Sequence, residues 1–113
     1  MTFDEYQEKA ISTLTSTHDY GDVTPELMAQ VLGLVGESGE VAEKFKKLIR
    51  DKQGALSDDD RKEIIKELGD ILWYVNAVAV LLGGSISDVA ETNLEKVLSR
   101  KARGATHGSG DNR

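Results

Sequence analysis

The chain has 113 residues, a formal net charge of −6 and no cysteine. This length allows a single domain, and the lack of cysteine excludes disulfides and thiolate metal sites. Net negative charge argues against nucleic acid as a main partner, because phosphate backbones attract clustered Lys and Arg. The sequence shows no apolar run as long as a membrane span and no signal peptide, so we expect a cytoplasmic protein without a membrane partner.

Apolar residues recur at helical spacing in four stretches, and no stretch alternates as a strand does. The expected helices run from Thr2 to Thr15, from Thr24 to about Arg50, from Ser57 to about Leu82, and from Ser85 or Ser87 to about Arg103. A loop is expected over residues 16–23. We expect one all-α domain over residues 1–103 and a disordered tail over residues 104–113, which is rich in glycine and polar residues.

Local sequence supports the starts of the second and third helices. Thr24 suits an N-cap, and Pro25 suits the first turn of a helix. Ser57 followed three residues later by Asp60 resembles a capping box, with Asp in place of the usual Glu. These signals favour a chain of helices joined by short turns.

Two carboxylate pairs of the same form lie in the second and third expected helices: Glu37 with Glu40, and Glu67 with Asp70. Residues three apart lie on one face of a helix. If the two helices pack side by side, four carboxylates converge, and such a cluster repels itself unless a hard divalent cation lies within it. The pattern predicts a magnesium site, with manganese as a substitute. The alternative is a solvated acidic face.

Neighbouring residues bear on this choice. Gly36, Gly39 and Gly69 flank the acids, and because glycine is costly inside a helix we expect something to pack closely there. Glu43 and Glu63 extend the acidic rows by one turn and are weaker candidates. A di-iron site is excluded because neither histidine follows a glutamate by three positions. An EF-hand is excluded because the acids do not alternate within a loop.

The stretch from residue 71 to 82, ILWYVNAVAVLL, is apolar around the whole helix except for Asn76. Such a helix cannot lie on the surface of a small bundle. We therefore expect a homo-oligomer, a dimer or tetramer, with Trp73, Val75 or Val80 in the subunit interface. Asn76 is expected to pair across that interface or to face a polar cleft. The alternative is a central core helix in a monomer.

The two pairs, separated by 26 residues, resemble the signature of the MazG-like nucleoside triphosphate pyrophosphohydrolases. This all-α superfamily includes dimeric dUTPases, dCTP pyrophosphatases and phosphoribosyl-ATP pyrophosphatase. The likeness runs from about Leu32 to Gly104 and includes the local phrases GLVGESGEVAE and KELGDILWYV. It implies a four-helix MazG-like bundle that assembles as a homo-oligomer.

The resemblance also implies an activity. Members cleave a nucleoside triphosphate between the α and β phosphates, releasing the monophosphate and pyrophosphate in a Mg²⁺-dependent reaction. The implied metal ligands are Glu37, Glu40, Glu67 and Asp70, and Glu37 or Glu40 would take the proton of the attacking water. The implied substrate contacts are Tyr74 near the base and, on the phosphates and sugar, Asn93, Lys96 and Arg100.

Purely structural interpretations of these residues also remain open. Tyr74 also suits a helical core, and the run from Asn93 to Arg100 also suits a polar helix face with a basic end. Two rival functions remain open: a phosphoribosyl-ATP pyrophosphatase, and a non-catalytic helical oligomer that binds a cation. The second rival would leave Asn93, Lys96 and Arg100 without a role.

Overall fold

The computed structural model describes residues 1–15, 18–105 and 107–112. Within these ranges it contains four α-helices and no strand, which confirms the expected all-α class: α1 (Phe3–Ile11), α2 (Pro25–Lys52), α3 (Asp58–Leu81) and α4 (Ile86–Ala102). Residues 16 and 17 of the expected loop, and residues 106 and 113 of the expected tail, lie outside the described residues. The predicted disorder of the tail stays a prediction.

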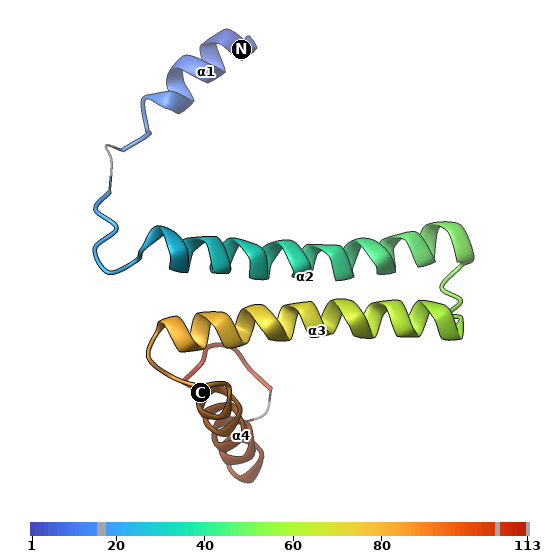
Figure 1. Ribbon diagram of the computed structural model, residues 1–113. Helices are drawn as coiled ribbons and strands as arrows, with labels where there is room; N and C mark the ends of the chain where they lie inside the picture. Colours follow the sequence, from blue (N-terminus) through green and yellow to red (C-terminus); the bar gives the residue numbers. More distant parts are fainter. Residues whose placement is uncertain (16–17, 106, 113) are drawn as a thin grey trace.

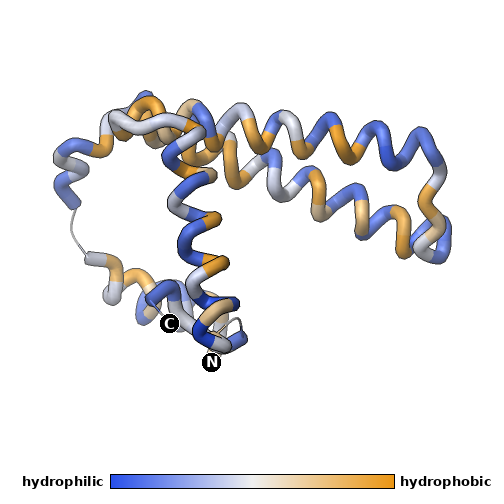
Figure 2. Tube along the Cα trace, turned by 90° about the horizontal axis from the view of Figure 1, so that it is seen from below, coloured by the Kyte–Doolittle hydropathy of each residue, from blue (hydrophilic) through white to orange (hydrophobic). Residues whose placement is uncertain are grey.

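The helices α2 and α3 lie side by side as an antiparallel hairpin (Figures 1 and 2). Helix α4 contacts α3 and is bent from it by 101°. Helix α1 contacts none of the other described helices and stands apart from the hairpin (Figure 1). The expected four-helix bundle is therefore not formed within one chain.

Side-chain caps begin α2, α3 and α4. The Thr24 hydroxyl accepts from the Leu27 amide at 3.1 Å, which confirms Thr24 as an N-cap. The capping box of Ser57 and Asp60 is present. Ser85, rather than Ser87, caps α4. Thr2 and Glu5 form a capping box at the start of α1 as well, so all four helix starts follow from local hydrogen bonds.

The turn between α2 and α3 depends on backbone in the left-handed region. Gln53 has φ 54° and Gly54 has φ 81°, a conformation that glycine adopts without strain. Lys52 then donates to the Asp60 carboxylate at 3.0 and 3.1 Å. An ion pair and a capping box thus meet at Asp60 and fix the closed end of the hairpin.

Helix α1 ends four residues before the predicted Thr15. The hydroxyls of Ser12 and Thr13 donate to the carbonyls of Lys9 and Ala10 at 2.6 and 2.7 Å. Such local side-chain bonds compete with helix propagation. The predicted end was wrong because the apolar spacing continues to Leu14 after the helical backbone has stopped.

Very little of the single chain is buried. Leu48, Ile64 and Ala79 are the buried apolar side chains among the described residues. The radius of gyration is 20.0 Å, whereas a compact chain of this length has about 13 Å. Trp73 and Val80 on α3 remain 59% and 56% exposed. Much of the apolar segment of α3 is therefore left uncovered within the single chain.

The apolar segment also bears on membrane insertion. No single helix in the described ranges combines the length and apolar composition of a membrane span, although α3 and α4 meet both criteria when taken together across their bend.

Candidate metal centre

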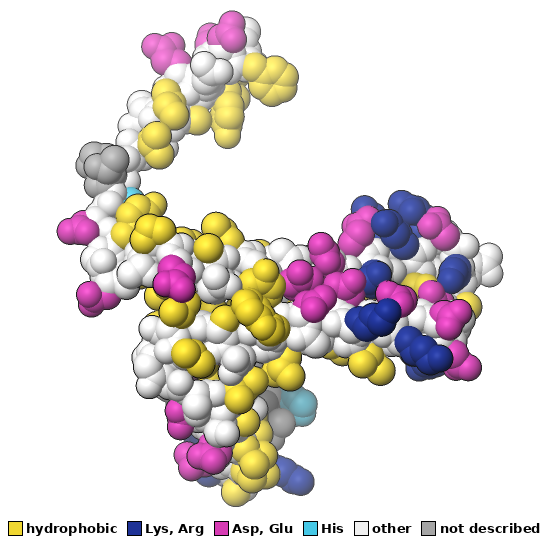
Figure 3. All heavy atoms as spheres, in the orientation of Figure 1, with side chains coloured by type: hydrophobic (Ala, Val, Ile, Leu, Met, Phe, Trp, Pro, Cys, Tyr) yellow, Lys and Arg dark blue, Asp and Glu magenta, His cyan; other side chains and the backbone are white. Residues whose placement is uncertain are grey.

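The two acid pairs face each other across the middle of the α2–α3 hairpin. Carboxylate oxygens of Glu37, Glu67 and Asp70 lie within 4.8 Å of one another. Acidic side chains gather over this part of the hairpin in Figure 3. Glu40 lies outside this group of three, but its carboxyl is close enough to perturb Glu37. The antiparallel packing of two helices thus brings three of the four predicted acids together.

Glu37 has an environment that disfavours its charge. Burial raises its pKa most, followed by the hydrogen bond that a protonated Glu37 shares with the Glu40 carboxyl. Repulsion from Glu40, Asp70 and Glu67 raises this pKa further. The Oε2 atom of Glu37 is buried and has no hydrogen-bond partner among the described residues. A buried, unsatisfied carboxylate oxygen surrounded by like charges fits a cation ligand.

A lysine provides part of the missing positive charge. Lys44, one turn after Glu40 on α2, lies 3.6 Å from the Glu67 carboxylate. The sequence interpretation did not single out Lys44. The sequence feature that could have identified Lys44 is its position four residues after the candidate ligand Glu40, a spacing that places both side chains on one helix face.

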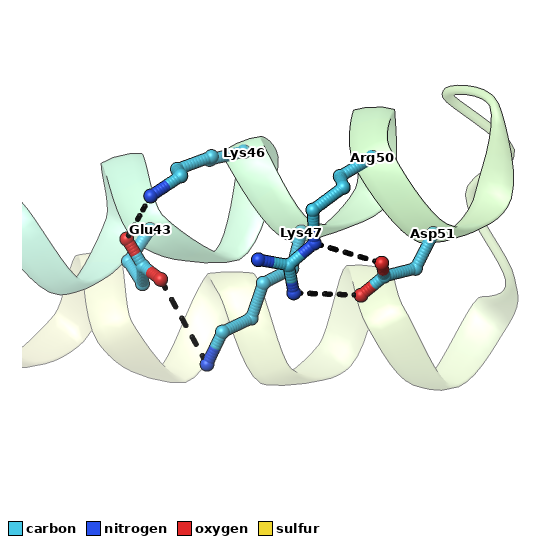
Figure 4. A network of polar contacts seen from close by, with 5 residues as sticks. All are labelled: Glu43, Lys46, Lys47, Arg50 and Asp51. Atoms are coloured by element: carbon cyan, nitrogen blue, oxygen red, sulfur yellow. Dashed lines mark hydrogen bonds and ion pairs between the residues drawn. The ribbon is translucent and has the colours of Figure 1, made fainter.

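The weaker candidates Glu43 and Glu63 are engaged elsewhere. Glu43 pairs with Lys46 at 3.8 Å and with Lys47 at 4.0 Å (Figure 4). Glu63 pairs with Lys66 at 3.0 Å. Each bond is with a helical neighbour, so these two carboxylates belong to the solvated face of the hairpin.

Glycine has a different role from the one expected. A Cβ atom added at Gly36, Gly39 or Gly69 would meet nothing within 4 Å among the described residues, so the predicted close packing at these positions is wrong for the single chain. The close approach is at Gly33, where a Cβ would lie 2.2 Å from Cε1 of Tyr74. Sequence reasoning missed Gly33 because the contact depends on the register between α2 and α3.

Tyr74, the predicted contact to the base, lies beside two of the acids. A surface hollow is lined by Glu37, Asp70, Trp73 and Tyr74. The two aromatic rings meet edge to face, with centroids 5.0 Å apart and planes at 85°. An exposed indole and a half-buried phenol thus border the carboxylates.

The three α4 candidates are not brought to the acids by any described contact. Lys96 donates to Asp111 at 2.9 Å, and Arg100 donates to the backbone carbonyl of Asp111 and lies 3.4 Å from its carboxylate. Asn93 is exposed on the same helix. The cations of α4 therefore form a second polar cluster, which pairs with the tail.

Comparison with known proteins identifies the family of the chain. Gene 37 protein of Mycobacterium phage L5 is 50% identical over 82 residues, which are 73% of this chain and 72% of the phage protein. No solved structure shows significant similarity to the chain. The profile of the MazG nucleotide pyrophosphohydrolase domain matches residues 24–104 and includes all four acids. The chain belongs to the MazG nucleotide pyrophosphohydrolase domain family.

Proposed function

We propose that this protein is a Mg²⁺-dependent pyrophosphohydrolase that cleaves a nucleoside triphosphate between its α and β phosphates. The monophosphate and pyrophosphate would be released by a homo-oligomer in the cytoplasm, with no role for nucleic acid. The observation that carries the proposal is the meeting of Glu37, Glu67 and Asp70 oxygens within 4.8 Å, inside a chain of the MazG family.

The donor set fits magnesium. Every candidate ligand is a carboxylate oxygen, the ligand type that hard cations prefer, and the buried Oε2 of Glu37 lacks a partner among the described residues. Glu37, Glu40, Glu67 and Asp70 would hold the ion. When bound, Mg²⁺ supplies positive charge to the triphosphate and makes an attacking water more acidic.

The remaining steps fall to side chains. Glu37 or Glu40 accepts the proton of the attacking water. Tyr74 contacts the base from the aromatic side of the hollow. Lys96 and Arg100 hold the phosphates by charge-assisted hydrogen bonds, and Asn93 bonds to sugar or phosphate.

Pyrophosphate release from a panel of nucleoside triphosphates, with Mg²⁺ and with chelator, tests the proposal. We expect release from at least one member of the panel, abolished by chelation and restored by Mg²⁺ or Mn²⁺. Phosphoribosyl-ATP belongs in the panel, since turnover of this compound alone would establish the rival pyrophosphatase. No release from any compound at saturating Mg²⁺ would overturn the hydrolase and favour the cation-binding oligomer.

A further inference from the structure

We infer that residues 107–112 act as an autoinhibitory strap, in which Asp111 occupies the anion site that Lys96 and Arg100 form for the substrate's phosphates. The inference rests on the proposed function, because the two cations are assigned there to the triphosphate. The contacts themselves are in the structure: Lys96 Nζ lies 2.9 Å from Asp111 Oδ1, and Arg100 Nη2 lies 3.4 Å from the same oxygen.

The anion site is built into α4. Arg100 is the one charged side chain that is buried among the described residues, at 7% exposure, and its Nε has no hydrogen-bond partner there. A buried guanidinium with a spare donor is incompletely satisfied by the carboxylate and the backbone carbonyl of Asp111. A phosphate group offers more acceptor oxygens and more charge, so it can satisfy the N–H donors of the Arg100 guanidinium more fully.

The Asp111 carboxylate of the strap can be replaced by another anion at the Lys96–Arg100 site. The Asp111 side chain is 80% exposed although it faces two cations. Exposed ion pairs contribute little to stability, so a triphosphate of about four negative charges can displace a single carboxylate. Hydrogen bonding to Lys96, and then to Arg100, lowers the pKa of Asp111, and Asp111 therefore stays charged at neutral pH.

The position of the strap in the chain also favours regulation. The MazG match ends at residue 104, so Asp111 lies beyond the segment that the family shares. The contact joins residues 15 positions apart and brings Asp111 back to the last turns of α4. Competition between strap and phosphate would raise the nucleotide concentration needed for turnover.

A single label can report the strap directly. Because the chain has no cysteine, Ser109→Cys in the 113-residue chain gives a unique site for a nitroxide. With chelator present and inorganic pyrophosphate as the probe, we expect the label to gain mobility as pyrophosphate saturates. In an Asp111→Asn background the label should be mobile before pyrophosphate is added. Asp22→Asn, the same charge change in an exposed loop, should behave as the unsubstituted background.

Pyrophosphate affinity by calorimetry gives a second readout. Loss of the competing carboxylate in Asp111→Asn should tighten binding about two- to fivefold, the range of an exposed ion pair, and Asp22→Asn should not. Label mobility and affinity that are equal in Asp111→Asn and Asp22→Asn would overturn the strap, as would failure of pyrophosphate to bind any variant. Either result would leave the proposed hydrolase standing, because nucleotide turnover by the unlabelled protein is measured separately. Conversely, a strap effect without any nucleotide turnover would contradict only the hydrolase.

Discussion

We expect the carboxylates around Glu37 to destabilise the metal-free protein and to be needed for its proposed activity. Glu40→Gln and Asp70→Asn should each retain helicity but lose Mg²⁺-dependent turnover by about a hundredfold or more, since even indirect partners of a metal affect activity about ten- to a hundredfold. Both should raise the melting temperature of the metal-free protein, because each removes repulsion from Glu37. Pyrophosphate release and thermal melting with chelator measure the two effects.

Glu43→Gln is the matched control for these variants. It removes the same charge from α2, but Glu43 pairs with Lys46 and Lys47 on the helix surface. We expect wild-type turnover and no gain in melting temperature. Wild-type turnover by both Glu40→Gln and Asp70→Asn would refute the four-acid site.

The contact between Gly33 and Tyr74 predicts an unusual pair of glycine substitutions. Gly33→Ala should destabilise the protein by about 1–3 kcal/mol, since the new methyl would overlap the Tyr74 ring. Gly36→Ala meets open space in the single chain and should stabilise α2 by up to about 1 kcal/mol. Denaturant unfolding measures both. The Tyr74 ring would not be the cause if both variants changed the free energy of unfolding equally. The same would follow if Gly33→Ala lowered this free energy as much in a Tyr74→Ala background as in the wild type.

At this scale the sequence predicted what depends on spacing along one helix. Glu37, Glu67 and Asp70 were found because steps of three place carboxylates on a common face. Gly33 and the pairing of Asp111 with Arg100 were not found, because each depends on which residues of two different segments meet. Glycine beside the acids was an unreliable signal for close packing.

Among the helices, Asp60 joins the start of α3 to the end of α2. Hydrogen bonds from the Ser57 amide and hydroxyl lower its pKa to about 2, with a further contribution from Lys52. A carboxylate whose folded pKa lies below its ordinary 3.8 stabilises the fold above that value, and this stability is lost as the pH falls toward 2. Asp60→Asn should therefore lower the melting temperature at pH 7 and have little effect near pH 2.

Asp59→Asn is the control, since it removes a charge from the same helical turn without touching Lys52. Ser57→Ala should retain the hairpin and lower the free energy of unfolding by about 0.5–2 kcal/mol at both ends of the pH range, because the N-cap hydrogen bond does not depend on charge alone. A melting temperature of Asp60→Asn that stays as far below wild type at pH 2.5 as at pH 7 would contradict this linkage.

Two substitutions in α4 test whether its cations bind the phosphates of the substrate or only stabilise the end of the helix. Lys96→Gln should lower kcat/KM about ten- to a hundredfold through lost charge-assisted bonds, with little change in melting, because Lys96 pairs only with the exposed Asp111 carboxylate among its described ion pairs. Lys101→Gln, on another side of the helix end, should leave both unchanged. Equal kcat/KM in the two variants would remove Lys96 from the substrate site. Arg100 is unsuited to this comparison because it is buried.

Helix boundaries were predictable where a side chain makes the terminal hydrogen bond. Thr24, Ser57 and Ser85 each cap the helix that follows them. The end of α1 was wrong because Ser12 and Thr13 bond backward to the helix, which apolar spacing does not reveal. The 101° bend between α3 and α4 also lay beyond the sequence, since Gly83 permits the turn without setting its angle.

For the whole molecule, the open shape and the exposed apolar surface have one physical consequence. A chain with a radius of gyration of 20.0 Å, against about 13 Å for a compact one, buries too little apolar surface to offset its conformational entropy. Figure 3 shows hydrophobic side chains along the hairpin and α4. Trp73 and Val80 are more than half exposed and Val75 is half-buried. These features agree with the proposed homo-oligomer.

Sedimentation at micromolar concentration should therefore return a dimer or tetramer, with the apolar segment of α3 in the interface. Val80→Asp places a charge on that surface and should shift the protein to monomer, with partial loss of helix content because the separated chain has so few buried side chains. Lys62→Asp, also an acidic substitution on an exposed position of α3, should leave the assembly intact. A wild-type monomer at these concentrations, or equal dissociation by both variants, would show that the interface lies elsewhere or that α3 is covered in another way.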